Sequence, residues 1–462
     1  MHNDMYLIEI TLVIVAALGS GLVFVRLNQP PILAYILVGV VLGPSGFEYV
    51  QDKGLVDKMA DLGILLLLFV VGMELNLRTF KKAWVATTLC TVLQIAVGLL
   101  IAFVLAPFFG WSLGMSLLLG FVLSLSSTAV VVNMLERIGE FRSDSGQFAI
   151  GVLIAQDLAI VPMILILGNL KGGAIFDLGL IIKLFVSIGM IVALIYYLSQ
   201  RQRVRIPLTQ IISGEKDLIP LASLGFCFTA AALSGVIGLS PPYGAFLAGL
   251  VLGNTHERLV LLEAIMPIQS TLLMVFFLSI GLMFDVSYVV EHWVMVTVLL
   301  FAITIAKTGI NIGILHVLRL PWTQSFLVGV VLAQLGEFAF MLAKVGGNVG
   351  IIDEDGKKLI ISLTVLSLAF SPLWLSSARR LKSGIKSGNI SFANLCSLAF
   401  GLGTGMRYYL NPSQWKNKKP KNQEDGVVEI RRLTHSGQIS SESTETLEGQ
   451  TDEALDPFSK ER

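Results

Sequence analysis

Charged residues are scarce in this chain of 462 residues: they make up 14% of it, whereas hydrophobic residues make up 54%. The formal net charge of +1 lacks the basic excess of a nucleic-acid-binding protein, so we expect no nucleic-acid partner. Only three cysteines occur, Cys90, Cys227 and Cys396, and their wide separation excludes the spacing of a metal site. No basic leader or small-residue cleavage site accompanies the first apolar segment near Met5, so we expect that segment to remain as a helix.

Apolar segments of about 20 residues recur along the chain, and this is the length that crosses the roughly 30 Å hydrocarbon core of a bilayer. Hydropathy and helix breakers predict an all-α integral membrane protein with about thirteen transmembrane helices. The predicted spans are 5–25, 31–43, 58–75, 83–107, 112–136, 146–168, 175–199, 218–238, 242–254, 266–284, 290–317, 323–345 and 358–378. The second and ninth spans are short for a full crossing, and each starts at a Pro-Pro pair.

We predict a transmembrane domain over residues 1–379 and a cytoplasmic tail over 380–462. With the N-terminus outside, the predicted cytoplasmic loops hold twelve Lys and Arg residues and the outer loops hold six. This asymmetry predicts an outer N-terminus and a cytoplasmic C-terminus, in the cell (inner) membrane. From Lys416 the tail is rich in Lys, Ser, Thr and Glu and poor in apolar residues, which is typical of disorder.

The predicted membrane domain repeats itself at offsets of 209 to 211 residues. The motif GVVLG at 39–43 returns as GLVLG at 249–253, Gly72 corresponds to Gly281, and Trp84 corresponds to Trp293. The two halves, 30–168 and 241–378, stand seven spans apart, and because seven is odd they must cross the membrane in opposite directions. Inverted-topology repeats of this kind are typical of secondary transporters, which bind their substrate near the midplane where broken helices meet.

A Gln156–Asp157 pair lies in the middle of an apolar stretch that is long enough to span a bilayer. A carboxylate at that depth costs on the order of 2.5–3.5 kcal/mol, so chains that keep one usually use it for an ion pathway or a proton relay. The alternative is a buried acid that is merely satisfied by a neighbouring hydroxyl. Gln156 either supplies a neutral carbonyl ligand or faces a neighbouring helix.

The fifth and twelfth spans are the predicted broken helices. Thr128 in the fifth span, next to Ser127, aligns with Glu337 in the twelfth at an offset of 209 residues. Interrupted helices expose carbonyls and dipole ends that can coordinate a cation, and the hydroxyls of Ser127 and Thr128 would add hard oxygen ligands. We therefore predict that Asp157 and Thr128 hold a monovalent cation. The alternative is that these hydroxyls only join neighbouring helices.

Lys307 places a third charge inside the predicted membrane domain. An unpaired lysine there is expensive, so we expect an acidic partner, which is Asp157 or Glu337. The alternative is that Lys307 snorkels toward the membrane surface. Lys183 and Lys344 lie close to segment ends, and we expect both to snorkel.

These motifs resemble the Kef-type branch of the monovalent cation:proton antiporters. The resemblance rests on GVVLGPSG, LLLLFVVGMEL, SLSSTAVV, LIAQDLAIVP, YGAFLAGLVLGNT, PIQSTLLMVFFLSIGLMFD and QLGEFAFML, in order between residues 30 and 345. It implies a dimerisation domain, a core domain with crossed discontinuous helices, an elevator-like movement and a homodimer. It also implies that Asp157 binds cation and proton, with Gln156, Ser127 and Thr128 near the ion, and that K⁺ is favoured over Na⁺.

The chain departs from that branch in its tail. Kef-type systems often continue into a Rossmann-type nucleotide-binding domain, whereas the tail here has only the glycine cluster GLGTG at 401–405, without a strand–turn–helix context. We therefore expect neither nucleotide nor glutathione gating, and no cofactor besides the transported cation and H⁺.

Together these features predict a membrane transporter, not an enzyme, in which one carboxylate binds a monovalent cation and a proton in competition. We expect electroneutral exchange, because one charge replaces another at that carboxylate. Three alternatives remain open: a cation channel, a sodium-coupled solute symporter and a non-transporting sensor of the same fold.

Overall fold

A computed structural model describes residues 2–27, 29–49, 53–74, 77–170, 178–200 and 218–386. Contacts divide the chain into two compact units, Met1–Leu402 and Gly403–Arg462, and the second lies outside the described residues. The same is true of the predicted tail beyond Lys386, with its GLGTG cluster, and of the basic segment 201–217. The account below therefore concerns the described part of the first unit.

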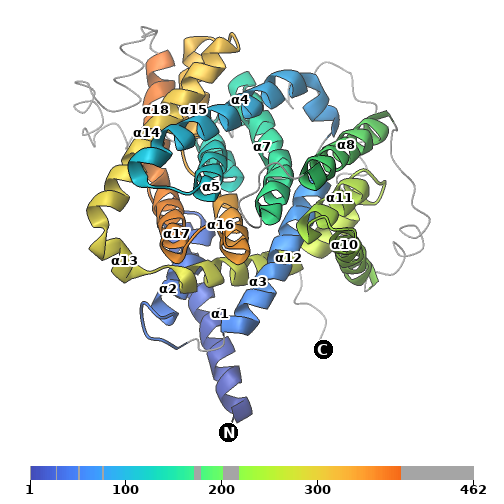
Figure 1. Cartoon of the computed structure of the whole chain (residues 1–462), viewed down its shortest axis with the longest axis vertical. Coiled ribbons are helices and arrows are strands. Elements are labelled where there is room, and N and C mark those ends of the chain that lie inside the picture. The colour runs from blue at the N-terminus through green and yellow to red at the C-terminus, as the bar shows by residue number, and fades with distance from the viewer. Residues whose placement is uncertain are drawn as a thin grey trace, which may run out of the picture. The chain divides into compact units, whose positions relative to one another are not determined.

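Every secondary-structure element of the described residues is an α-helix. The helices are α1 (His2–Arg26), α2 (Pro31–Leu42), α3 (Lys53–Glu74), α4 (Leu77–Phe109), α5 (Leu113–Ser124), α6 (Thr128–Ile138), α7 (Asp144–Asn169), α8 (Leu178–Gln200), α10 (Leu218–Val236), α11 (Pro241–Gly253), α12 (Arg258–Met283), α13 (Val286–Glu291), α14 (Trp293–Val317), α15 (Trp322–Val331), α16 (Phe338–Val349), α17 (Glu354–Ala369) and α18 (Ser371–Lys386). Figure 1 shows their arrangement.

Each predicted span corresponds to one helix or to a pair of helices separated by a short break. Among the described residues, six helices are long and apolar enough to cross a membrane, or up to seven if the bent pair at 354–384 is one span. Shorter apolar helices, among them α2, α11, α15 and α16, accompany them. The number of thirteen crossings therefore stays a prediction. Helix α18 continues to Lys386, beyond the predicted domain boundary at residue 379.

The helices pack as two groups. The first group consists of α1, α2, α3, α10, α11 and α12, with a separate apolar core around Phe69, Met73 and Leu252. The second group is built on α4, α5, α7 and α14 to α18, and Figure 1 shows α5, α16 and α7 close together within it. Contacts between the groups are sparser and include α7 with α11, and α17 with α2 and α12.

Two glycine pairs let helices of the first group approach closely. Gly39 of α2 faces Gly281 of α12, where a Cβ atom on Gly281 would lie 2.7 Å from the Gly39 Cα. Gly72 of α3 faces Gly249 of α11, where a Cβ atom on Gly72 would lie 2.8 Å from the Leu250 nitrogen. Real Cβ atoms do not approach other atoms this closely, so only glycine permits these backbone contacts.

The fifth and twelfth predicted spans are interrupted, as expected. Residues 125–127 separate α5 from α6, and residues 332–337 separate α15 from α16. The Ser127 hydroxyl caps α6 by accepting a hydrogen bond from the Val130 N–H at 3.4 Å, which favours a new helix start there. The last span, predicted as one helix, instead breaks between α17 and α18 with a bend of 45°.

Replacement of Gly281 by alanine tests the close approach of α2 and α12. The added methyl group would overlap the Ile36 carbonyl oxygen, and overpacking of this kind destabilises by roughly 1–3 kcal/mol. We expect Gly281→Ala to lower the Tm of the purified protein in detergent. Gly309→Ala on α14 is the matched control, because a Cβ there has no atom within 4 Å and should not lower the Tm. Equal Tm values for the two variants would contradict the predicted contact.

Candidate cation-binding site

The two helix breaks cross in the second group of helices. A Cβ atom on Gly336 would lie 2.9 Å from the Ser126 carbonyl oxygen, so the two segments of backbone nearly touch. The Ser126 hydroxyl donates a hydrogen bond to the Leu332 carbonyl at 2.8 Å and so links one break to the other. From α17, the Ser367 hydroxyl accepts a hydrogen bond from the Leu335 N–H at 3.0 Å. The crossing is therefore held by side chains as well as by backbone contact.

Asp157 lies on α7 beside this crossing. Its side chain is buried, with 8% of the residue exposed. The Thr128 hydroxyl, on the first residue of α6, is 3.3 Å from Oδ1 and 3.2 Å from Oδ2 of the carboxyl group. The positive end of the α6 dipole also favours a negative charge near its first residue. The structure thus brings together the acid and the hydroxyl that the sequence paired as cation ligands.

Glu337 and Ser127 lie at the same crossing. Glu337 precedes the first residue of α16, and the Ser127 side chain and the Ala129 backbone interact with its carboxyl group. The Glu337 Oε2 atom is buried and has no hydrogen-bond partner among the described residues. Glu337 also interacts electrostatically with Asp157. Four predicted site residues, Asp157, Thr128, Ser127 and Glu337, therefore gather around the two breaks.

Lys307 reaches the breaks from α14, but its predicted ion pair is wrong. Its ammonium group donates to the Leu125 carbonyl of one break and to the Gln334 carbonyl of the other, the latter at 2.9 Å. Snorkelling is also wrong, because only 2% of Lys307 is exposed. The physical reason is that each break leaves carbonyl groups without a helical partner, and an ammonium group carries three donors that can satisfy them.

Gln156 faces a neighbouring helix, which was one of its two predicted roles. Its Oε1 accepts a hydrogen bond from the Ser126 N–H at 2.9 Å, and its Nε2 donates to the Gln94 Oε1 at 2.9 Å. Gln94 and its partner Asn311 were not among the residues predicted from the sequence. The available signal was an amide side chain in the middle of each of the predicted spans 83–107 and 290–317.

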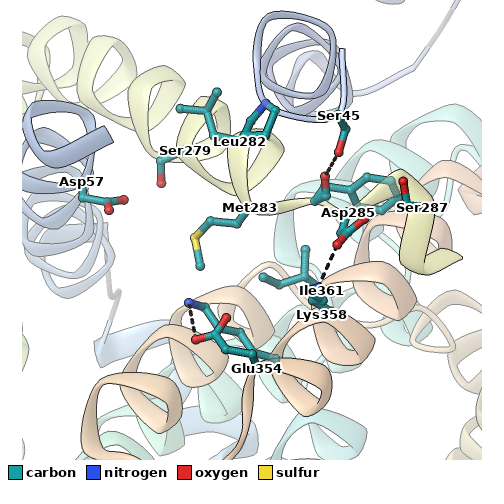
Figure 2. A pocket seen from close by; sticks show the side chains of 13 residues that line it. Ser45, Asp57, Ser279, Leu282, Met283, Asp285, Ser287, Glu354, Lys358 and Ile361 are labelled. Carbon is teal, nitrogen blue, oxygen red and sulfur yellow. Dashed lines mark hydrogen bonds and ion pairs between the residues drawn. The ribbon is translucent and has the colours of Figure 1, made fainter. Parts of the chain in front are cut away.

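A second polar region lies where α17 meets the first group of helices. A cavity of about 370 Å³ there is lined by Asp57 of α3 and Ser279 of α12, and by Glu354 and Lys358 of α17 (Figure 2). Lys358 forms an ion pair of 2.8 Å with Asp285, and this contact lowers the pKa of Asp285 from its ordinary value.

Lys344 and Lys183, for which we predicted snorkelling, each make a specific polar contact in the structure. The Lys344 ammonium group on α16 is 2.7 Å from the Asp61 carboxylate on α3, so this ion pair joins the two helical groups. Lys183 donates a hydrogen bond to the Asn169 side chain at 3.3 Å. Within the described residues, no group of three His, Cys, Asp or Glu side chains is arranged to hold a metal ion.

The family described as "Sodium/hydrogen exchanger, transmembrane" matches residues 12–378. The chain belongs to this family. It is therefore a multi-pass membrane protein of the monovalent cation:proton antiporter superfamily, and a transporter rather than an enzyme. The resemblance drawn from the sequence motifs is confirmed at this level.

Proteins similar to this chain are named for different cations. Iron transporter MagA from Paramagnetospirillum magneticum is 43% identical over 390 residues, which cover 84% of this chain and 89% of MagA. K(+) efflux antiporter 5 from Arabidopsis thaliana is 33% identical over 378 residues, which cover 81% of this chain and 66% of the plant protein. The fold is similar to that of the sodium proton antiporter MjNhaP1 from Methanocaldococcus jannaschii, with a TM-score of 0.63, 16% identity, and coverage of 82% of this chain and 98% of that one.

Replacement of Lys307 tests its contacts with the two breaks of the antiporter. Lys307→Met keeps the unbranched apolar part of the side chain but leaves the Leu125 and Gln334 carbonyls without this donor, and a buried unsatisfied group costs about 1–3 kcal/mol. We expect a lower Tm in detergent than for the wild type. Lys183→Met, which removes one long hydrogen bond at 3.3 Å, is the control and should change the Tm little. A Lys307→Met protein as stable as the wild type would show that these contacts contribute nothing.

Proposed function

We propose that this protein exchanges a monovalent cation, K⁺ in preference to Na⁺, for protons across a membrane. The observation that supports the proposal is the Asp157–Thr128 pair, buried at the crossing of two helix breaks. A bare carboxylate is costly in such a place, so Asp157 holds either a proton or a cation. Because both ligands use the same carboxylate, release of one accompanies binding of the other, and this competition couples their movement.

In the proposed cycle, the deprotonated Asp157 carboxylate and the Thr128 hydroxyl oxygen bind the cation, with Ser127 and Glu337 beside it. A proton that arrives at Asp157 releases the cation. Gln156 holds the Ser126 backbone in place. Lys307 keeps its contacts with the break carbonyls in both halves of the cycle and so adds no net charge to a full cycle, and we propose one-for-one, electroneutral exchange.

We propose the preference for K⁺ because the plant relative is named a K(+) efflux antiporter. The name of the solved neighbour, a sodium proton antiporter, keeps Na⁺ in the comparison. The name of MagA adds iron to the cations to be tested. A carboxylate and a hydroxyl are hard oxygen donors, which suit an alkali cation better than the softer donors that select transition metals.

We further propose the architecture that the sequence predicted: thirteen crossings, an outer N-terminus, a cytoplasmic C-terminus and a homodimer in the cell (inner) membrane. The first group of helices would be the dimerisation domain and the second the mobile core. The glycine contacts support the inverted repeat, because Gly39 with Gly281 and Gly249 with Gly72 are the same pairing in the two halves.

Two rivals are a cation channel and a sodium-coupled solute symporter. Proteoliposomes that accumulate ⁸⁶Rb⁺ in exchange for internal unlabelled K⁺ while the membrane potential is clamped at zero, with saturation, support exchange and exclude a channel. Cation-driven proton movement without any organic solute excludes a symporter. We therefore expect K⁺ to collapse an imposed pH gradient, with smaller effects of Na⁺ and Li⁺, and Fe²⁺ is tested in the same assay.

Replacement of Asp157 by asparagine tests the assignment of the carboxylate. Asp157→Asn keeps the shape of the side chain and can still hydrogen-bond with Thr128, but it can no longer exchange a proton for a cation. We expect a folded protein with no K⁺-driven dissipation of the pH gradient. Asp144→Asn, in the exposed first turn of the same helix, is the control and should retain the wild-type rate. Persistent exchange in Asp157→Asn would rule out Asp157 as the carrier of both ions.

A membrane potential tests the proposed stoichiometry. If one cation replaces one proton, no net charge crosses, and the initial rate should be the same at potentials of opposite sign. The potential is set with a permeant ion that the protein does not transport, and proton movement is followed with a trapped pH dye. A rate that changes with the sign of the potential would exclude one-for-one exchange while leaving the competition at Asp157 intact.

A further inference from the structure

A closed ring of buried amides surrounds the crossing of the two breaks. Gln156 Nε2 on α7 donates to Gln94 Oε1 on α4 at 2.9 Å, and Gln94 Nε2 donates to Asn311 Oδ1 on α14 at 2.9 Å. Asn311 Nδ2 donates to the Leu332 carbonyl at 3.2 Å. The Ser126 hydroxyl donates to the same carbonyl, and its N–H donates to Gln156 Oε1, which closes the ring. Each of the four polar side chains is at most 2% exposed.

The ring has one self-consistent direction. At one end the Ser126 N–H can only donate, so the carbonyl oxygen of Gln156 must face it. The Gln156 NH₂ group then faces the Gln94 oxygen, and the Gln94 NH₂ group faces the Asn311 oxygen. At the other end the Leu332 carbonyl can only accept, so it receives the Asn311 NH₂ group. A flip of any amide would set two donors or two acceptors against each other in a buried place, where an unmade hydrogen bond costs about 1–3 kcal/mol.

The ring touches both sides of the Asp157–Thr128 contact. Gln156 directly precedes Asp157 on α7, and Ser126 lies two residues before Thr128. The hydrogen bond between Gln156 and Ser126 therefore sets the distance between the carboxylate and the hydroxyl. It also fixes the direction in which the Gln156 carbonyl oxygen points.

We propose that Gln94 and Asn311 are positioning residues that set the affinity of the Asp157 site for its cation. They act through Gln156, and among the described residues they hydrogen-bond with neither the carboxylate nor the Thr128 hydroxyl. This inference rests on the proposed function, because it assumes that Asp157 binds a transported cation. Partners at this remove from an ion typically change its affinity by roughly 10–100-fold when they are mutated.

Helix α14 adds a second link on the same face. Asn311 follows Lys307 by four residues, so both side chains lie on one side of the helix. Lys307 binds carbonyls of both breaks, and Asn311 binds the Leu332 carbonyl of the second. The ring and the lysine thus join α4, α7, α14 and both breaks into one body, which would carry the ion site as a unit.

The test replaces Gln94 by leucine, which fills similar space but removes both amide contacts. We expect the apparent KM for K⁺ in proteoliposomes to rise by about tenfold or more, with kcat within about twofold of the wild type. Hydrogen exchange at residues 125–127 should accelerate, because the acceptor of the Ser126 N–H is no longer held. Gln269→Leu is the matched control: it removes a buried glutamine from α12 in the other helical group and should change neither readout.

A double variant separates positioning from general stability. Gln94→Leu and Asn311→Leu break one chain of hydrogen bonds at neighbouring links, so the KM of the double variant should equal that of the worse single variant. KM effects that multiply, or a lower Tm and kcat with an unchanged KM, would overturn the proposal. If the wild type moves no alkali cation, the proposed function fails. Accelerated exchange at 125–127 in Gln94→Leu but not in Gln269→Leu would still establish the ring as the brace of the first break.

Discussion

Backbone groups at a helix break cannot stay unpaired inside a membrane, and this constraint explains the buried polar residues that contact the two breaks. An α-helix satisfies its own N–H and C=O groups, whereas each break frees several of them where no water is at hand. The ammonium group of Lys307 donates hydrogen bonds to carbonyls of both breaks, and the Ser126 hydroxyl and the Asn311 amide donate to another carbonyl of the second break. The Ser367 hydroxyl accepts a hydrogen bond from an N–H group of that break. The buried polar residues at the crossing therefore supply the hydrogen bonds that allow two helix breaks to lie in one place.

The breaks and the central contact could be predicted from the sequence, but the partner of Lys307 could not. Repeat alignment placed Thr128 opposite Glu337, and both lie at helix starts beside a break. The sequence shows that Lys307 is a buried charge, and it does not show that breaks offer carbonyls in place of a carboxylate. The roles of Gln94 and Asn311 could not be predicted for a related reason. A single amide in a membrane span has no sequence periodicity, and its hydrogen-bond partners are known only once the packing of α4, α7 and α14 is known.

Packing differs in kind between the two helical groups. Helices of the first group touch through paired glycines, which allow close backbone contact, and Arg258 of α12 adds hydrogen bonds to the last carbonyls of α3. Helices of the second group are held at the breaks by side-chain hydrogen bonds to backbone groups. Between the groups, the apolar core continues through contacts such as that of Phe277 on α12 with Phe340 on α16, and the Lys344–Asp61 ion pair and the polar cavity beside Asp285 lie beside it. Helices of each group contact one another more than they contact the other group, as the proposed relative movement requires.

The contrast between saturated and unsaturated polar groups also singles out Asp157. Gln156, Gln94 and Asn311 make hydrogen bonds of 2.9 to 3.2 Å that engage both the oxygen and the nitrogen of each amide. Among the described residues, the Thr128 hydroxyl is the hydrogen-bond donor to Asp157. It lies 3.2 and 3.3 Å from the two carboxylate oxygens, and these distances are long for an O–H donor. A carboxylate needs more than that when it is buried. The amides hold the crossing together through hydrogen bonds at both ends, whereas the Asp157 carboxylate and the Glu337 Oε2 atom beside it keep acceptor capacity that the proposed ion exchange requires.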